Sequence, residues 1–553
     1  MSVPVPHASA PDGGLMMRHL TELARYEKLS GSRQEAQSLA YIREVLAGHG
    51  FAVQLHGHDA YISLPGAARV EVDGRVLTAI THSMSQSSPP AGTAGRLVDV
   101  GAGGAADFAR QDVSGCIVLV HGMATPAVSS NASRAGAAGQ LHISPHEHLH
   151  EMCLSPVWGN PSEGTMAQLP TTVVCTVSQA DGGAVRDALA SGANPSVILH
   201  AAVDTGWRTT PMLVAELPSM AGIADEPFIL FSGHHDTWHF GAMDNGTANV
   251  TMMEVARLCA QSRDAWRRGL RLCFWSGHSH GRYSGSAWYA DTHWDELERR
   301  CVAHVNIDSV GAVGASVLGN AGCSTELSGL AADIIAKQTG QRHVGKRMTR
   351  AGDQSFWGIG IPSMFMSLSE QVPGGVSMRH ALGWWWHTPD DLLDKIDPDN
   401  LTRDARIYLE VLDRLLTDPV LPIDHTAQLN ALLEELDSLA STQAHGLALD
   451  DIRELVVGLR DAWAAVGTRL DAEARNACIL RLCRALVPLD YTSGDRFGHD
   501  PALPIPAWPA LEPLRRLAGA TPGSDAAKGL LVSARQARNR VFHALRDARS
   551  SIG

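Results

Sequence analysis

Continuous apolar runs alternate with amphipathic segments between residues 206 and 415. The runs are PFILFSG (227–233), LRLCFW (270–275), VAHVNI (302–307) and GWWW (383–386). Short apolar runs bounded by turn residues predict buried strands, and the segments between them have helical spacing. This region is therefore predicted to form a doubly wound α/β sheet flanked by helices.

Three further regions surround this sheet in the chain. Residues 15–50 have apolar positions at helical spacing on either side of GSRQEA, and residues 50–80 read as short strands with turns. From about 84 to 205, strand signals such as GCIVLVHG are joined by small-residue helices, which predicts a compact α/β insert. Beyond residue 420 the pattern is helical, over 425–441, 449–466, 471–486 and 525–550.

Composition narrows the class of protein. The chain has 553 residues, 44% of them hydrophobic and 19% charged, which is typical of two or three globular domains. The net charge of −13 argues against a nucleic-acid binder, and no run approaches the ~18 apolar residues of a membrane span. The nine cysteines include no Cys-x-x-Cys pair, and the N-terminus lacks a signal-peptide pattern. We therefore expect a soluble, cytoplasmic protein that does not act at a membrane.

Each of the four apolar runs leads into a histidine or an aspartate. These residues are His234, His278, Asp308 and His387. In open α/β sheets, ligands bind beyond the carboxyl ends of the strands, and imidazoles and carboxylates are ligands of Zn²⁺. Taken singly, each residue is more easily explained as a helix cap or a buried polar side chain. Together they predict a metal site.

Neighbouring residues extend this candidate. Asp244 precedes a segment with an apolar helical stripe. Asp236 shares a face with His234 in an extended segment, where its carboxylate would hold the imidazole ring. Thr388 and Pro389 predict a helix that begins directly after His387.

Four segments occur in a recognisable order: RYEKLSGSRQEAQSLAYIREVLAGHGF, GHHDTWHFGAMDNGTANV, NIDSVG and WHTPDDLLDKID. With them the sequence resembles the zinc-dependent aminopeptidase and glutamate-carboxypeptidase superfamily, in the branch that includes the transferrin receptor. The resemblance implies a zinc-peptidase-like mixed sheet built from residues 1–83 and 206–415. It also implies a protease-associated domain at 84–205, which we expect to pack across the metal edge, and a helical dimerisation domain at 416–553, hence a homodimer.

The resemblance also implies the roles of single residues around one or two zinc ions, or another divalent metal. Asp244 would bridge two ions, His234 and Asp308 would complete the ligand set of one, and His387 would serve the other. Asp236 would orient His234. A cis peptide bond is expected between Asp244 and Asn245. The pair Asp353-Gln354 lies where the family contacts substrate, although a plain loop before a strand explains it equally well.

The stretch WSGHSHGRYSGS departs from the family, which has two adjacent glutamates here, a general base followed by a metal ligand. Counted from Trp275 or Gly281, His278 takes the base position and Ser279 the ligand position. Counted back from Gly285, Ser279 and His280 take them instead. Histidine can act as a ligand or as a base near neutral pH. We expect His278 to face the metals, and His280 to join it if the loop is extended.

A second histidine group lies in the insert. It comprises His142, His146, His148 and His150, with Glu147 and Glu151 between and after them. Such a run is typical of a solvated loop. Alternatively, the insert leans over the active site and lends these side chains to the substrate.

These observations favour a metal-dependent hydrolase of a peptide or small amide substrate. Metal-activated water would attack the carbonyl, and a histidine would handle the proton in place of the usual glutamate. Loss of the glutamate pair favours an alternative, a non-catalytic binding protein like the transferrin receptor. A metal enzyme of another reaction type, such as a lyase or a hydrolase of a non-peptide substrate, is a third possibility.

Overall fold

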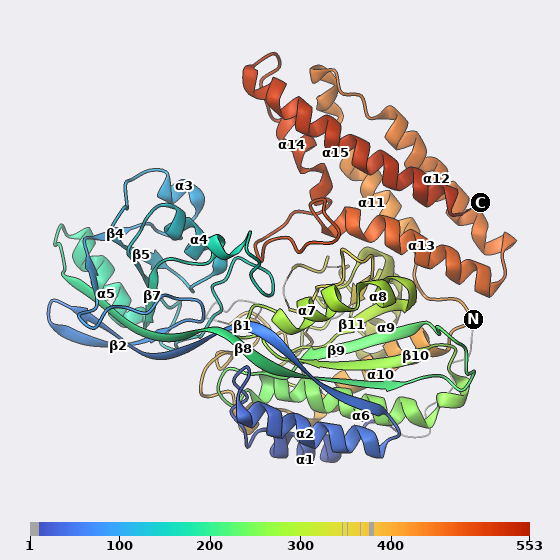
Figure 1. Cartoon of the computed structure of the whole chain (residues 1–553), viewed down its shortest axis with the longest axis horizontal. Coiled ribbons are helices and arrows are strands. Elements are labelled where there is room, and N and C mark those ends of the chain that lie inside the picture. The colour runs from blue at the N-terminus through green and yellow to red at the C-terminus, as the bar shows by residue number, and fades with distance from the viewer. Residues whose placement is uncertain (1–9, 346, 351, 365–366, 375–380, 553) are drawn as a thin grey trace.

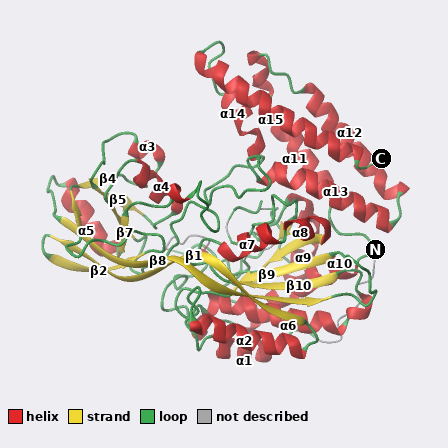
Figure 2. Ribbon diagram, viewed as in Figure 1, coloured by secondary structure: helices red, strands yellow, loops and turns green. Residues whose placement is uncertain are grey.

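The computed structural model of the chain describes residues 10–345, 347–350, 352–364, 367–374 and 381–552. Figure 1 shows a central sheet with flanking helices, a second α/β lobe formed by the insert, and a group of C-terminal helices above the sheet. In Figure 2, long strands run from the central lobe into the insert lobe. The expected mixed α/β fold with a helical C-terminal region is confirmed.

The central lobe contains six strands of a larger mixed sheet. In spatial order they are β12 (Ser363–Met364), β11 (Cys301–Asn306), β9 (Phe228–His234), β10 (Gly269–Trp275), β8 (Val197–Leu217) and β1 (Ala52–Val72). The first four are parallel, and β8 is antiparallel to both β10 and β1. Every residue of β9, β10 and β11 is buried, which explains their continuous apolar runs.

Strands β1 and β8 form a two-stranded ribbon that joins the two lobes. Each has 21 residues, and their pairing runs from Ala52 opposite Glu216 to Val72 opposite Val197. The expectation of short strands over 50–80 is therefore wrong for β1. The expected boundary after residue 205 falls inside β8, because the same strand serves both lobes.

The insert lobe continues the sheet beyond this ribbon. Its strands are β2 (Arg75–Thr81), β7 (Val173–Val177), β6 (Gly139–Ile143), β5 (Ile117–His121) and β4 (Leu97–Asp99), and β3 (Thr93–Gly95) pairs with β8. The last four strands of the path are parallel to one another. The helices of this lobe are α3 (Ala105–Phe108), α4 (Pro126–Arg134) and α5 (Gln179–Ala190).

Helices cover both faces of the central sheet. On one face lie α1 (Gly13–Leu23), α2 (Arg33–Gly48), α6 (Ala248–Gln261) and α10 (Pro398–Thr417). On the other lie α7 (Ser284–Thr292) and α8 (Trp294–Arg300), while α9 (Ser328–Thr339) packs against α10. All but three residues of α6 are buried, so this helix forms part of the core.

The segment after residue 382 differs from expectation. GWWW is a turn and not a strand, and Gly383 (φ 95°) and His387 (φ 59°) have left-handed backbone conformations that a strand does not allow. No helix follows at Thr388. The next long helix is α10, which begins at Pro398 and is capped by the Asp397 carboxylate.

The C-terminal region consists of packed helices. They are α11 (His425–Ser438), α12 (Asp450–Arg469), α13 (Ala472–Tyr491), α14 (Glu512–Ala518) and α15 (Asp525–Ser550). Four match the expected helices, and α14 is an addition that follows the Pro-rich loop. Within the described residues, no helix combines the length and apolar character needed to cross a bilayer.

Candidate metal centre

His234 is the last residue of β9 and lies at the carboxyl edge of the sheet, with its side chain 2% exposed. Its Nδ1 lies 2.7 Å from the main-chain oxygen of Asp236. A carbonyl oxygen only accepts, so Nδ1 carries a hydrogen and Nε2 is the atom that faces the carboxylates. Among the described residues Nε2 has no hydrogen-bond partner, and it lies 3.0 Å from Asp244 Oδ1 and 3.6 Å from Asp308 Oδ1.

Asp244 and His387 form the other half of the group. Asp244 lies in a π-helical turn, Ala242–Thr247, and its peptide bond to Asn245 is cis, as expected. Asp391 accepts hydrogen bonds from the Met243 and Asp244 main-chain nitrogens, which fixes this turn. His387 donates from Nδ1 to the Glu151 carbonyl and places Nε2 3.0 Å from Asp244 Oδ2. The Asp244 carboxylate therefore lies between the Nε2 atoms of two imidazoles.

This arrangement fits a bound cation. Burial alone would raise the pKa of Asp244, but His234 and His387 hold it well below its usual range. Burial alone would lower the pKa of His234, but the carboxylates of Asp308 and Asp244 raise it well above its usual value. The site thus attracts positive charge. Two imidazole nitrogens and two carboxylates are the donor set of zinc sites.

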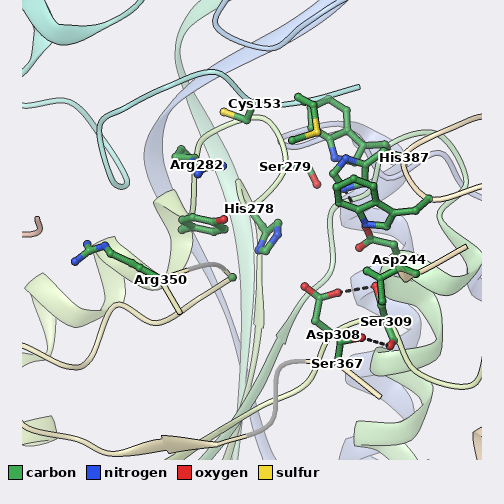
Figure 3. Close-up of a pocket in the computed structure, with 16 residues that line it drawn as sticks. Cys153, Asp244, His278, Ser279, Arg282, Asp308, Ser309, Arg350, Ser367 and His387 are labelled. Carbon is green, nitrogen blue, oxygen red and sulfur yellow. Dashed lines mark hydrogen bonds and ion pairs between the residues drawn. The ribbon is translucent and has the colours of Figure 1, made fainter. Parts of the chain in front are cut away.

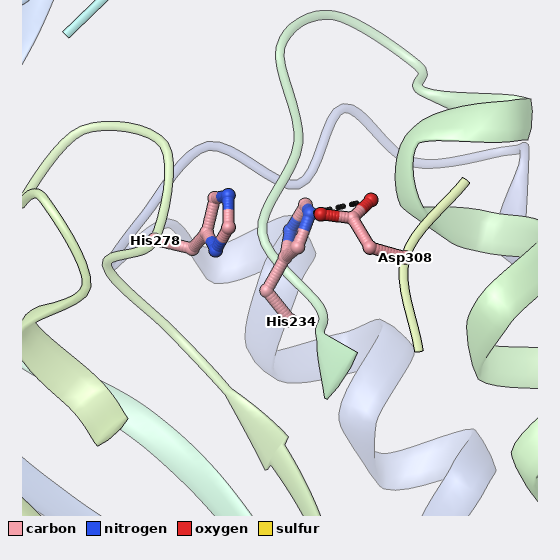
Figure 4. Close-up of side chains that lie close together, drawn as sticks. All are labelled: His234, His278 and Asp308. Carbon is pink, nitrogen blue, oxygen red and sulfur yellow. Dashed lines mark ion pairs between the residues drawn. The ribbon is translucent and has the colours of Figure 1, made fainter. Parts of the chain in front are cut away.

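His278 lies beside this group. One ligand atom from each of His234, His278 and Asp308 lies within 4.8 Å of the others (Figure 4). The His278 ring stacks on the His234 ring with a centroid distance of 3.7 Å and an interplanar angle of 15°. His278 Nδ1 lies 2.9 Å from Asp353 Oδ2, and the buried Asp353 also accepts from Ser286 Oγ. Burial alone would raise the pKa of Asp353, but His278 lowers it, which keeps the carboxylate ionised.

The structure separates His278 from His280. The loop between β10 and α7 is neither extended nor helical, and His280 is fully buried between Trp238 and Ser30, whose Oγ lies 2.9 Å from His280 Nδ1. Burial lowers the pKa of His280 to about 3. The condition under which His280 would join His278, an extended loop, is therefore not met, and His280 is not among the residues that line the cavity. The Ser279 hydroxyl lines the cavity and has no hydrogen-bond partner among the described residues.

The Asp236 carboxylate does not bond to the His234 ring, contrary to expectation. Its carbonyl orients His234, whereas the nearest carboxylate oxygen is 3.9 Å from His234 Nδ1. The carboxylate instead accepts hydrogen bonds from the main-chain nitrogens of His278 and Ser279 and from Ser30 Oγ. It therefore fixes the loop that carries His278.

A cavity of about 110 Å³ opens beside these residues (Figure 3). Asp244, Asp308 and His387 line one side, and Arg282 and Arg350 lie across from them in this view. The Arg350 side chain is 6% exposed, and its Nε and Nη2 have no hydrogen-bond partner among the described residues. Burial lowers the pKa of Arg350 to about 10, so it stays protonated at neutral pH. Gln354 is buried and is not among the residues that line the cavity.

The insert reaches the metal edge of the sheet. Met152 and Cys153 line the cavity, and His146 and His150 are 5% and 3% exposed, so this segment is not a solvated loop. His150 contacts the main chain beside His387, and burial lowers its pKa to about 3. Sequence analysis did not identify Arg282, Arg350 or the structural role of Asp391, because their positions depend on contacts between distant segments.

Comparison with known proteins identifies relatives. Residues 213–412 match the model of peptidase family M28. A probable glutamate carboxypeptidase of Zea mays is 26% identical over 254 residues, which cover 41% of this chain and 34% of the maize protein. A probable glutamate carboxypeptidase of Arabidopsis thaliana is 24% identical over 238 residues, covering 38% and 32%. The matched part is thus about a third of the length of these two relatives.

Solved structures share the fold. An aminopeptidase from Aneurinibacillus sp. strain AM-1 superposes with a TM-score of 0.56 and 20% identity, over 74% of this chain and 94% of that one. A zinc aminopeptidase from Bacillus subtilis has a TM-score of 0.57 and 18% identity, over 75% and 97%. The family match covers the strands and turns that carry His234, Asp244, Asp308 and His387. Residues 213–412 therefore match peptidase family M28 in sequence, and the solved aminopeptidases share the fold.

Proposed function

We propose that this protein is a metal-dependent hydrolase of a peptide or small amide substrate. The convergence of His234 Nε2 and His387 Nε2 on one carboxylate, Asp244, carries this proposal. His234, Asp244 and Asp308 would hold one zinc ion, and His387 with Asp244 would hold another. Zinc in such a site polarises the substrate carbonyl and makes bound water more acidic.

His278 is the proton acceptor in this proposal. Its ring is nearly parallel to that of His234, so the in-plane lone pairs of the two rings do not converge on one point. A stacked imidazole is thus better placed to take a proton at Nε2 than to share an ion with His234. The Asp353 carboxylate accepts from Nδ1, which leaves Nε2 free and stabilises the imidazolium that forms.

The two halves of the site differ in charge. His234 has two carboxylates beside it, while His387 has Asp244 and the neutral hydroxyl of Ser279 nearby. A carboxylate stabilises a dication more than a hydroxyl does. We therefore expect one ion to bind tightly at His234 and a second to bind weakly at His387.

The cavity favours a substrate with an acidic group. Two guanidinium groups line it, and the Nε–H and Nη2–H groups of Arg350, which have no partner among the described residues, suit a carboxylate. The names of the plant relatives, glutamate carboxypeptidases, agree with such a substrate. The small volume admits one end of a peptide rather than a long segment.

Metal content and peptide hydrolysis, measured on the same purified samples, test the proposal. The wild-type protein should bind at least one zinc ion per chain and release an acidic residue from dipeptides, and a chelator should abolish turnover. His234→Ala should lose the tightly bound ion. His304→Ala removes a buried histidine of the neighbouring strand, bonded to two serines, and should keep the metal. A folded wild-type protein that binds no metal would overturn the proposal.

The role of His278 has its own test. His278→Ala should keep the metal content while turnover falls by about 10²–10⁴-fold. His280→Ala should retain both the metal and most of the turnover. Loss of the ion in His278→Ala would make His278 a ligand instead.

The alternative is a binding protein without catalysis, and the neutral Ser279 at the expected ligand position favours it. That alternative predicts a folded protein in which neither zinc nor His278 affects any hydrolysis. A metal enzyme of another reaction type would instead bind zinc without cleaving peptides.

A further inference from the structure

The turn that carries His387 has an unusual backbone conformation. His387 has φ 59°, and Gly383 in the same turn has φ 95°. A residue with a side chain is disfavoured in this left-handed region, so surrounding contacts must hold it there. His387 Nε2 nevertheless has to lie 3.0 Å from Asp244 to complete its half of the site.

The insert supplies contacts to this turn from residues 148–151. Glu151 and His387 form two reciprocal hydrogen bonds, from Glu151 N to His387 O and from His387 Nδ1 to Glu151 O. His150 Nδ1 lies 2.5 Å from the carbonyl oxygen of Trp386. His148 stacks on Trp384 with a centroid distance of 4.0 Å. Three consecutive parts of the turn are therefore held by one short segment of the other lobe.

The hydrogen bonds within the insert fix the direction of each donor. The Trp386 carbonyl can only accept, so His150 donates from Nδ1 and accepts at Nε2. His146 accepts from the His148 main-chain nitrogen at Nδ1 and donates from Nε2 to His150 Nε2, at 3.0 Å. The His146 carbonyl in turn accepts from the Gln179 nitrogen at the start of α5. The histidines thus form a directed chain from the body of the insert to the His387 turn.

We propose that His150, supported by His146, is a positioning residue that fixes the His387 turn, and that the insert thereby completes the second half of the metal site. This inference rests on the proposed function only in taking His387 as a metal ligand. It gives the histidine group of the insert a role that is neither substrate contact nor metal binding.

Substitutions at His150 separate this role from general packing. His150→Ala removes the donor to Trp386 O and leaves the buried His146 Nε2–H without its acceptor. His150→Asn places an amide N–H where Nδ1–H was, so it should restore the bond to the turn while still losing the bond to His146. His142→Ala is the matched control. His142 is another fully buried histidine of the insert, and it bonds to Gly122 O and Gln140 Oε1, within its own lobe.

The metal-free full-length protein is titrated with Zn²⁺ in competition with a chelator. The binding step that is lost in His387→Ala is assigned to the His387 half of the site. Relative to wild type, His150→Ala should weaken this step by about 10–100-fold and leave the step assigned to His234 unchanged. His150→Asn should recover most of the affinity. Hydrogen exchange of residues 381–391 should be faster in His150→Ala, and thermal unfolding should confirm that all variants are folded.

Three outcomes would overturn the inference. The first is unchanged affinity at the His387 step in a folded His150→Ala protein. The second is an equal loss in His142→Ala, which would mean that insert stability alone controls the site. The third is failure of His150→Asn to recover any affinity. By contrast, a wild-type protein without any zinc binding would overturn the proposed function itself, so the two failures are distinguishable.

Discussion

At the scale of single residues, the site differs from the resembled family in charge. His278 and Ser279 take positions where two glutamates are expected, so the site lacks two carboxylates. The negative charge that remains belongs to Asp244 and Asp308, with Asp353 behind His278. In the proposed function, the proton acceptor is therefore an imidazole whose Nδ1 is bonded to a carboxylate.

Arg350 provides a test of substrate charge. Arg350→Met removes the unpaired donors but keeps the apolar part of the side chain over Trp158. The Michaelis constant for a dipeptide with a C-terminal glutamate should rise by about 10-fold or more, because a charge-assisted hydrogen bond contributes about 1.5–3 kcal/mol. The same dipeptide ending in glutamine is the control. Equal effects on both substrates would contradict a carboxylate contact.

The buried carboxyl group of Glu326 should make the free energy of unfolding depend on pH. It is 1% exposed, its two carboxylate oxygens have no hydrogen-bond partner among the described residues, and burial raises its pKa to about 8. Its pKa in the unfolded chain is about 4.3, so the folded state favours the protonated form. Its contribution to stability is therefore complete below about pH 4 and declines as the pH rises towards 8, by up to about 1.4 kcal/mol per unit.

Glu326→Gln removes this titration. Thermal unfolding should show the variant more stable than wild type at pH 8, with the difference disappearing near pH 4.5. Glu434→Gln, at an exposed position of α11, should follow wild type at both values. A constant difference between Glu326→Gln and wild type across this range would mean that Glu326 does not titrate there.

At the scale of elements, the carboxyl ends of β9, β10 and β11 position the candidate site, and the loop after β10 carries His278, the proposed base. Asp236 bonds to that loop through its carboxylate and to His234 through its carbonyl. Asp236→Asn should therefore lower turnover, by about 10-fold or more, while the affinity for the first zinc ion stays near that of wild type. A large loss of zinc affinity would mean that the carboxylate itself supports His234.

The elements that sequence analysis predicted well have strong local patterns. The fully buried strands β9–β11 appear as continuous apolar runs, and α6 has a clear apolar stripe. Strand β1 was not recognised as one element because many of its residues are exposed on both faces, so apolar and polar residues do not alternate along it. The His387 turn was misread because its conformation depends on contacts with residues 148–151, which no local pattern contains.

The local sequence also could not decide whether His278 or His280 lies at the candidate site. The two histidines are two positions apart in a polar loop, and either could take the place of a glutamate. After His280 the loop turns through left-handed conformations at Arg282 (φ 50°) and Tyr283 (φ 70°). Burial of His280 against Trp238 and Ser30 then leaves His278 alone at the site.

At the scale of the whole molecule, the C-terminal helices predict self-association. Helices α11–α15 pack mainly on one another, and α15 contacts α12, α13 and α14. Val532 of α15 is nevertheless 56% exposed. We propose a homodimer through this region, as the resemblance implies. Light scattering at micromolar concentration should give twice the chain mass, and a monomer mass across the range that holds activity would contradict the proposal.

The ribbon of β1 and β8 bears on how such a protein could change during evolution. The chain enters and leaves the insert lobe through two strands that are hydrogen-bonded neighbours, with Ser63 opposite Thr205. A short hairpin could therefore replace the whole lobe without breaking the central sheet, and a lobe could be acquired at the same place by lengthening a hairpin. The ancestry of the two lobes can thus be separate even though their sheet is continuous. Because residues 148–151 contact the turn that bears His387, however, such a deletion would leave a sheet that carries only half of the proposed metal site.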